Sequence, residues 1–222
     1  KLVYILGGNG HIGYDVTKTI SLLGAKCLVL DITNNKIKKI KNKKLKFEKF
    51  DCSKLDSIED NLNKLINQYG VPYALVNCSY PRTDNYTNTS IKNIKLNDFS
   101  KNIESHLNSY AWISRFFCEK MKIKKKGVLL NFGSIYGVVG QDLDLYKNTE
   151  SQDNFVYPII KGGITNMTRQ LASTYGKFNI RVNCLCPGAI DSHVPGLNKP
   201  ISKKFKNKLI KKIPLKRLGD TD

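Results

Sequence analysis

The sequence predicts an α/β fold built on one doubly wound parallel sheet, and three observations lead to that prediction. Apolar runs of strand length alternate with longer amphipathic stretches along the 222-residue chain, as in parallel strands joined by helices. A glycine cluster follows the first apolar run directly. An aspartate closes the second apolar run, at the edge where parallel sheets bind ligands.

Six apolar runs are the expected strands, at residues 2–6, 26–31, 45–50, 73–77, 127–132 and 180–185. The expected helices fill the intervals: one from the glycine cluster to about Leu23, a basic helix within 34–44, an amphipathic helix that Ser57 caps and Gly70 ends, a long helix near 97–121, and one that holds Tyr157. This order predicts a Rossmann-type sheet. We expect a single domain over residues 1–222, with a substrate-loop region at about 189–215.

The chain is strongly basic, with a formal net charge of +19. Only five of its 37 basic residues are arginines, so 32 are lysines, and they are spread over the whole chain. Specific recognition of nucleic acids depends heavily on arginine. A compositional bias toward lysine, asparagine and isoleucine therefore explains the charge, and we expect no specific nucleic-acid partner.

The sequence also argues against membrane and metal binding. No apolar run approaches the length of a membrane span, and no signal-peptide pattern opens the chain. The six cysteines are dispersed, without a C-x-x-C pair or a histidine at zinc-finger spacing, and predict neither a metal site nor a disulfide framework. We expect a cytoplasmic protein that contacts no membrane and holds no metal.

The glycine cluster GGNGHIG places Gly7, Gly10 and Gly13 between the first strand and the first helix. Glycines there let the backbone approach a pyrophosphate, which the helix N-terminus then faces. Asp31 stands where a carboxylate accepts hydrogen bonds from an adenosine ribose and repels a 2′-phosphate. The loop predicts a dinucleotide cofactor, and Asp31 favours NAD over NADP. The alternative for Asp31 is an ordinary turn residue at a strand end.

Tyr157 and Lys161 stand four residues apart, so they share one face of the expected helix. Pro158 suits the first turn of a helix and biases Tyr157 toward a capping conformation. A free phenol has a pKa of about 10, and a nearby ammonium lowers it by stabilising the phenolate. The pair is a candidate acid–base centre, although the spacing alone equally allows a surface tyrosine beside a solvated lysine.

Five motifs, in order along the chain, resemble those of the short-chain dehydrogenase/reductase family: GGNGHIG, LVNCS at 75–79, NFGSIYG at 131–137, YPIIKGG at 157–163 and IRVNCLCPGAI at 180–190. The resemblance implies hydride transfer between a nicotinamide cofactor and an alcohol or ketone. It implies that Tyr157 is the catalytic acid–base, that Lys161 is its partner, and that Ser134 orients the reacting oxygen. It also implies a final helix and strand, which the printed chain lacks.

The same resemblance implies which residues line the cofactor. Asp51 and Cys52 are expected beside the adenine, and the segment from Pro187 to Ser192 beside the nicotinamide. The full set comes from the glycine loop, the strand ends, the catalytic helix and the segment after the last strand: Gly7, Asn9, Gly10, His11, Ile12, Gly13, Asp31, Ile32, Asp51, Cys52, Asn77, Cys78, Ser79, Tyr157, Lys161, Pro187, Gly188, Ile190 and Ser192.

Three departures from the family pattern lie near the expected substrate. Where the family has N-N-A-G, this chain ends the segment with Tyr80, so a bulky ring replaces a glycine beside the cofactor. His106 stands where the family's long helix offers an asparagine to a proton relay, so it is either a substitute catalytic residue or a structural histidine. A longer stretch than usual, including residues 141–155, separates Ser134 from Tyr157 and is expected to act as a lid.

The segments NCSYPRT, GSIYGVVGQD and YPIIKGGI are most similar to a subgroup associated with bacterial surface-sugar biosynthesis and flagellin modification. That similarity implies a sugar or sugar-phosphate substrate. Tyr80, Arg82 and Tyr136 are expected to border it. Arg82 suits a phosphate or carboxylate, with a surface role as its alternative. We expect an anionic sugar as the small-molecule substrate and a homo-oligomeric assembly.

Two other functions remain open. A 3-ketoacyl-type reductase would share the motifs but use NADPH, and Asp31 argues against that cofactor. A cofactor-sensing or RNA-binding protein would share the fold. Such a protein would not need Ser134, Tyr157 and Lys161 together.

Overall fold

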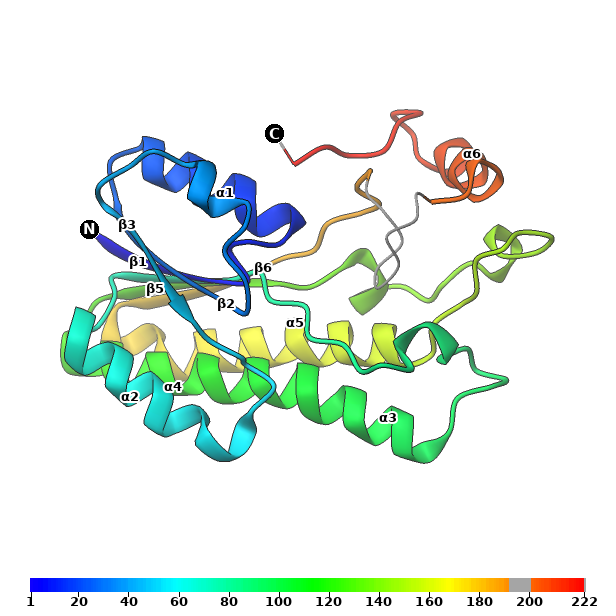
Figure 1. Ribbon diagram of the computed structural model, residues 1–222. Helices are drawn as coiled ribbons and strands as arrows, with labels where there is room; N and C mark the ends of the chain where they lie inside the picture. The colour runs from blue at the N-terminus through cyan, green and yellow to red at the C-terminus, as the bar shows by residue number, and fades with distance from the viewer. Residues whose placement is uncertain (192–200, 222) are drawn as a thin grey trace.

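The computed structural model describes residues 1–191 and 201–221, and it contains a six-stranded sheet with helices on both faces (Figure 1). The strands are all parallel, in the order β3-β2-β1-β4-β5-β6. The predicted fold class is confirmed, and each strand end lies within one residue of its expected position. The strands are β1 Leu2–Leu6, β2 Lys26–Asp31, β3 Leu45–Lys49, β4 Ala74–Asn77, β5 Gly127–Phe132 and β6 Ile180–Leu185.

The helices cover the sheet unequally. In Figure 1, α1 lies over one face and α2, α4 and α5 lie under the other. In the part of the chain that the structure describes, no helix is long and apolar enough to cross a membrane. The helices are α1 His11–Leu22, α2 Ile58–Tyr69, α3 Leu96–Asn102, α4 Ser109–Ile123, α5 Val156–Tyr175 and α6 Lys203–Lys212.

Strand β1 shows why its sequence is continuously apolar. Alternate side chains point to opposite faces of a strand. Tyr4 and Leu6 therefore enter the core shared with α2 and α4, whereas Val3 and Ile5 enter the core under α1. A strand that is buried on both faces has no polar position to offer, which is typical of a parallel sheet covered by helices.

One predicted helix is wrong. Within residues 34–44 the structure forms a single 3-10 turn, Ile37–Lys39. Asn9 Oδ1 accepts hydrogen bonds from the amides of Lys36 and Ile37, at 2.9 and 3.1 Å. These bonds hold the start of the turn, Ile40 after it is extended with φ of −81° and ψ of 104°, and lysines three and four residues apart repel one another. The helix therefore does not extend beyond this turn.

The predicted long helix is continuous but changes its winding. Between α3 and α4 the chain forms a π-helical segment, Ile103–Asn108, which contains His106. Such widened turns occur frequently at functional sites, because they redirect one side chain out of the helical register. His106, which lies in this segment, is therefore a candidate functional residue.

The strand order reverses between β1 and β4, which pair with Leu6 opposite Asn77. At such a point the chain leaves neighbouring strands in opposite directions, and the crevice between them binds ligands in open α/β sheets. The fold therefore places the candidate site at the carboxyl ends of β1 and β4.

Candidate active site

The glycine loop is packed too tightly for side chains at two positions. Gly7 has φ of +71°, and a Cβ on it would lie 2.6 Å from Ser79 Cα. A Cβ on Gly13 would lie 2.0 Å from the Gly7 carbonyl oxygen. Gly10 is less crowded, with 3.1 Å to the same oxygen. Glycine is required at 7 and 13 because it brings the start of α1 against the ends of β1 and β4, and the result is a cradle suited to a pyrophosphate.

Asp31 lies at the end of β2, with its carboxylate oriented by three amides. Oδ2 accepts from the Asn9 amide at 2.9 Å, and Oδ1 accepts from the amides of Ile32 and Thr33, at 2.7 and 3.4 Å. Oδ2 keeps a further lone pair for a ligand hydroxyl. Ile32 is 58 % exposed and presents an apolar surface beside this carboxylate.

Asn9 has a structural role that its motif position does not reveal. Its Nδ2 donates to Thr33 Oγ1 at 2.8 Å and to Asn35 Oδ1 at 2.7 Å, while its Oδ1 holds the amides of the 3-10 turn. The side chain ties the glycine loop to the segment after β2. Ile12, next to this loop, packs into the core between α1 and the sheet.

Asp51 and Cys52, in the segment after β3, have different surroundings. Asp51 Oδ1 accepts from the amide and the hydroxyl of Ser53, at 3.0 and 2.6 Å, and the carboxylate stays partly exposed. Cys52 is buried in the core, and burial raises the pKa of its thiol to about 11. Asp51 is therefore accessible to a ligand, and Cys52 contributes packing.

The end of β4 carries a buried donor without a partner. Asn77 Oδ1 accepts from the amide and the hydroxyl of Ser79, at 3.2 and 2.7 Å. Among the described residues, Asn77 Nδ2 has no hydrogen-bond partner. A buried unsatisfied donor costs about 1–3 kcal/mol, and a bound acceptor would remove that cost. Cys78 is held near Lys161, and burial raises its thiol pKa to about 12.

The segment after β6 lies beside the Ser134 turn. The amides of Gly133 and Ile135 donate to the carbonyls of Leu185 and Pro187, at 2.8 and 3.1 Å. Gly188 is exposed, and Ile190 forms a bridge with Gly219. His11 Nε2 lies 3.0 Å from the Asp191 carbonyl oxygen, so the start of α1 contacts the same segment. The last residue of the expected cofactor set, Ser192, lies outside the described residues.

Helix α5 begins one residue before Tyr157, so Tyr157 is helical instead of capping. Asn154 performs the capping, because its Oδ1 accepts from the Tyr157 amide at 2.8 Å. Ser134 is buried, its hydroxyl oxygen accepts from the Tyr136 amide at 3.2 Å, and its hydroxyl acts on the Tyr157 phenol so as to lower the pKa of that phenol. Ser134, Tyr157 and Lys161 are brought together as expected.

Lys161 is 3 % exposed, and its Nζ donates to the Phe132 carbonyl oxygen at 2.8 Å. Burial lowers the pKa of Lys161 to about 8. The ammonium lies 5.8 Å from the centre of the Tyr157 ring. It leaves two further N–H donors for a ligand, since an ammonium carries three.

The expected lowering of the Tyr157 pKa by Lys161 is not found. Burial raises the pKa of Tyr157, and the hydrogen bond from Ser134 opposes that rise only in part. The physical reason is that the Lys161 ammonium donates to the Phe132 carbonyl and lies 5.8 Å from the centre of the Tyr157 ring, so burial of the phenol dominates its pKa. Tyr157 is therefore protonated at neutral pH in this arrangement.

His106 is buried at 1 % exposure, and neither of its ring nitrogens has a partner among the described residues. Burial lowers the pKa of His106 strongly, and the charges of Lys161 and Arg82 lower it further, so the ring is neutral. Its ring centre lies 5.0 Å from that of Tyr80 and 5.4 Å from that of Tyr110. A neutral imidazole can accept one hydrogen bond and donate one.

Two tyrosines flank Tyr157. The ring centres of Tyr80 and Tyr136 lie 6.0 and 6.5 Å from that of Tyr157. Arg82 is exposed, with its guanidinium carbon 5.5 Å from the centre of the Tyr80 ring. The three residues expected to border the substrate therefore lie near the Tyr157 phenol.

The long connection before α5 packs against α6. Asp142 pairs with Lys212 at 3.0 Å, Lys208 Nζ donates to the Asp144 carbonyl at 2.8 Å, and the rings of Tyr146 and Phe205 lie 5.2 Å apart. Figure 1 shows this connection beside α6. That it opens and closes as a lid stays a prediction.

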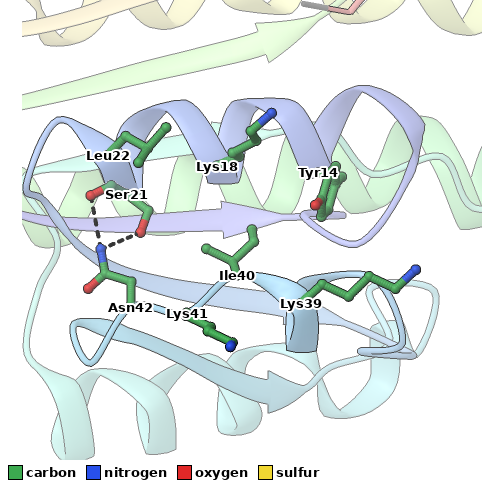
Figure 2. Close-up of a pocket in the computed structure, with 8 residues that line it drawn as sticks. All are labelled: Tyr14, Lys18, Ser21, Leu22, Lys39, Ile40, Lys41 and Asn42. Carbon is green, nitrogen blue, oxygen red and sulfur yellow. Dashed lines mark hydrogen bonds between the residues drawn. The ribbon is translucent and has the colours of Figure 1, made fainter.

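A separate hollow of about 220 Å³ lies between α1 and residues 39–42 (Figure 2). Asn42 closes one wall by donating to the carbonyl and hydroxyl of Ser21, at 3.1 and 2.7 Å. Lys18, Lys39 and Lys41 line it, and none of its lining residues belongs to the expected catalytic or cofactor sets. The candidate site is therefore distinct from this hollow.

Three residues that support the candidate site were not predicted from the sequence. Asn154 precedes Tyr157 by three residues, which is a capping signal, but the proline after Tyr157 suggested a different start of the helix. Tyr110 donates to the carbonyls of Asn77 and Ser79, both at 2.9 Å. Tyr86 bonds Tyr80 through their hydroxyls. These two contacts join distant parts of the chain and leave no local pattern.

Comparison with known proteins finds a matching family and several similar proteins. Residues 1–200 match the family model described as short chain dehydrogenase. The chain is 26 % identical over 197 residues to the post-translational flagellin modification protein A of Campylobacter coli, covering 86 % of this chain and 77 % of that protein. It is equally identical over 226 residues to a 3-oxoacyl-[acyl-carrier-protein] reductase of Chlamydia muridarum, covering 99 % and 84 %. A short chain dehydrogenase from Leptospira borgpetersenii, solved with bound NAD⁺, is 30 % identical with a TM-score of 0.86, over 100 % of this chain and 81 % of that one.

Proposed function

The chain belongs to the short-chain dehydrogenase family, and on that premise we propose that it is an NAD-dependent oxidoreductase whose substrate is an anionic sugar or sugar phosphate. Hydride would pass between the nicotinamide and a sugar hydroxyl or its keto form. The observation that carries the proposal is the group of Ser134, Tyr157 and Lys161 beside the glycine loop.

The residues of this chain fit a nicotinamide dinucleotide. The cradle at Gly7 and Gly13 leaves backbone room for a pyrophosphate, and the Asn77 Nδ2 donor lacks a partner among the described residues. Lys161 has N–H donors to spare for a ribose hydroxyl. When bound, the nicotinamide supplies the hydride acceptor or donor. The remaining chemistry falls to the side chains.

Proton transfer is assigned to Tyr157. Its hydroxyl is protonated at neutral pH because burial raises its pKa, so it is set to give a proton to a ketone oxygen. Ser134 Oγ supplies a second hydrogen bond to that oxygen and fixes its position. Lys161, half-neutral near pH 8, returns positive charge to the site at lower pH and stabilises the phenolate that remains. His106 offers a neutral ring to relay the proton onward.

Asp31 supports NAD as the preferred cofactor. Its carboxylate is fixed by the Asn9 and Ile32 amides and keeps acceptor capacity for ribose hydroxyls. A 2′-phosphate at the same place would be repelled. The NAD⁺ bound to the Leptospira borgpetersenii protein agrees with this choice.

Arg82 supports an anionic substrate. Burial raises the pKa values of Tyr80 and Tyr86 and lowers that of His106, and the charge of Arg82 opposes the first two shifts and adds to the third, so the guanidinium acts on the cluster beside Tyr157 even though the side chain is exposed. A guanidinium recognises phosphate or carboxylate with paired hydrogen bonds. The Campylobacter coli relative is named for flagellin modification, the process of the subgroup that the sequence motifs resemble.

A substrate screen tests the proposal. The purified protein is assayed with NAD, NADP and their reduced forms against sugar phosphates, nucleotide sugars, neutral sugars and a 3-oxoacyl thioester, by the absorbance of the reduced nicotinamide. The expected result is turnover of a phosphorylated sugar with NAD, and a large loss when the phosphate is removed. Preference for the thioester with NADPH would instead assign the activity of the Chlamydia muridarum relative.

A further inference from the structure

We propose that Tyr80 limits the size of the substrate, as a specificity-determining wall beside Tyr157 that Tyr86 clamps in place. The inference rests on the proposed function in one respect, namely that substrate reacts next to the Tyr157 hydroxyl. It does not depend on whether that substrate is a sugar.

The Tyr80 ring stands among the groups expected to handle the proton. It meets Tyr157, His106 and Tyr86 edge-on, with interplanar angles of 60°, 79° and 80°. Lys161 Nζ and the Arg82 guanidinium carbon lie 5.4 and 5.5 Å from its centre. Cations at this distance are attracted to an aromatic face. Turning the ring would disrupt all of these contacts, so its orientation is strongly held.

A hydrogen bond between the hydroxyls of Tyr80 and Tyr86 holds the far end of the ring. Tyr86 is itself buried and fixed: its amide donates to the Thr83 carbonyl at 3.1 Å, and its carbonyl accepts from Thr89 Oγ1 at 2.8 Å. The clamp is therefore part of the folded segment after β4 and not a mobile surface contact.

The same clamp reaches the start of α5. The Asn154 side chain lowers the pKa of Tyr86, against the larger rise caused by burial, and Asn154 Oδ1 accepts from the Tyr157 amide at 2.8 Å. The Phe155 amide also donates to the Thr89 carbonyl at 2.7 Å. The segment carrying Tyr80 and the helix carrying Tyr157 are thus tied together, which fixes the separation of the two rings.

A phenol ring held at this distance occupies space that a substituent on the reacting carbon would otherwise fill. Fixed walls discriminate between substrates by steric overlap, and even one methylene changes selectivity by about tenfold or more. Replacing Tyr80 with glycine would free the volume of a whole ring. We therefore expect Tyr80→Gly to raise kcat/KM for bulky substrates and not for small ones.

The test uses two ketones that differ only in bulk, cyclohexanone and trans-2-decalone, each with NADH and with NADPH. The ratio of kcat/KM for the bicyclic ketone to that for the monocyclic ketone is measured in the wild type and in Tyr80→Phe, Tyr80→Leu, Tyr80→Gly and Tyr86→Phe. The ratio is independent of the fraction of folded enzyme, so a loss of stability does not imitate the effect.

We expect the ratio to rise at least about tenfold in Tyr80→Gly and by less in Tyr80→Leu. Tyr80→Phe keeps the ring but loses the hydroxyl that bonds Tyr86, so it should move the ratio only part of the way. Tyr86→Phe removes the clamp while leaving Tyr80 in place, and should move the ratio part of the way. The matched control is Tyr69→Phe, which removes another hydrogen-bonded phenol, that of Tyr69 on Glu48 far from the site.

Binding separates this inference from the proposed function. If the wild type reduces neither ketone, as a strict requirement for an anionic substrate would cause, the same ratio is taken from dissociation constants of the ketones for the enzyme–NADH complex, by fluorescence of the bound cofactor. The proposed function is tested separately, by the substrate screen. A ratio that is unchanged in Tyr80→Gly, by turnover where it exists and by binding otherwise, overturns the role of Tyr80.

Discussion

At the scale of one residue, the buried charge of Lys161 lowers the free energy of unfolding while it serves the proposed chemistry. The ammonium is buried, and its pKa falls to about 8 in the folded chain against about 10.4 when unfolded. Between these two values the unfolded chain binds more protons than the folded one. The contribution of Lys161 to the free energy of unfolding therefore rises with pH across that window. At neutral pH the buried charge is a net cost.

Lys161→Met should consequently remove activity without removing stability. A methionine fills similar space without a charge to desolvate, so we expect a Tm at or above that of the wild type at neutral pH. The advantage should shrink as pH rises from about 8 toward about 10. Thermal denaturation followed by circular dichroism checks this, with Lys18→Met as the exposed control. A Tm several degrees below the wild type at neutral pH would contradict it.

Asp31→Ala should weaken the preference for NAD. The repulsion of a 2′-phosphate disappears, and we expect the ratio of the NADPH to the NADH dissociation constant to fall at least about tenfold, or about 1.4 kcal/mol. Fluorescence titration of both reduced cofactors measures it. Asp51→Ala is the matched control, because Asp51 lies just after the neighbouring strand β3 and should leave the ratio unchanged. A wild type that already prefers NADPH would refute the reading of Asp31.

At the scale of elements, sequence patterns predicted what local chemistry controls. Apolar runs located the six strands, and Gly70, with φ of +87°, ends α2 as expected. The predicted helix was wrong at residues 34–44. There Asn9, which lies in the distant glycine loop, accepts hydrogen bonds from two backbone amides. The prediction also failed at Ser57, which precedes α2 without capping it and instead bonds Asn61 at 3.2 Å.

The candidate site was predictable where topology governs it. Parallel order brings the glycine loop, Ser134 and Tyr157 to one edge of the sheet, so their motifs sufficed. The Tyr80–Tyr86 pair and the direction of the Lys161 ammonium depend on side-chain packing between separate segments. No periodicity in the sequence encodes such contacts, and the pKa of Tyr157 was misjudged for that reason.

Asn154→Ala tests the start of α5. Removing the cap should cost about 1 kcal/mol in the free energy of unfolding, measured by urea denaturation. Because the lost bond is to the Tyr157 amide, kcat should fall more than cofactor affinity does. Asn61→Ala, which alters a half-buried side chain on α2, is the control. Equal effects of the two variants on kcat would show that capping does not position Tyr157.

At the scale of the whole molecule, the helices leave large apolar side chains on the surface. Leu96 is 81 % exposed, Trp112 is 44 % exposed, and the Arg115 guanidinium carbon lies 4.8 Å from the Trp112 ring. Surfaces of this kind favour association. We expect light scattering to give a multiple of the chain mass, and Trp112→Glu to lower it. A monomer at micromolar concentration would contradict the expected homo-oligomer.

The central claim is that Tyr157 moves the proton in a site built around a nicotinamide dinucleotide, and one variant tests it most directly. Tyr157→Phe keeps the ring and its contacts but removes the titrating oxygen. The account predicts NADH binding within about twofold of the wild type and a loss of turnover of at least about 100-fold on the best substrate. Turnover within a few-fold of the wild type, with NADH still bound, would contradict the claim.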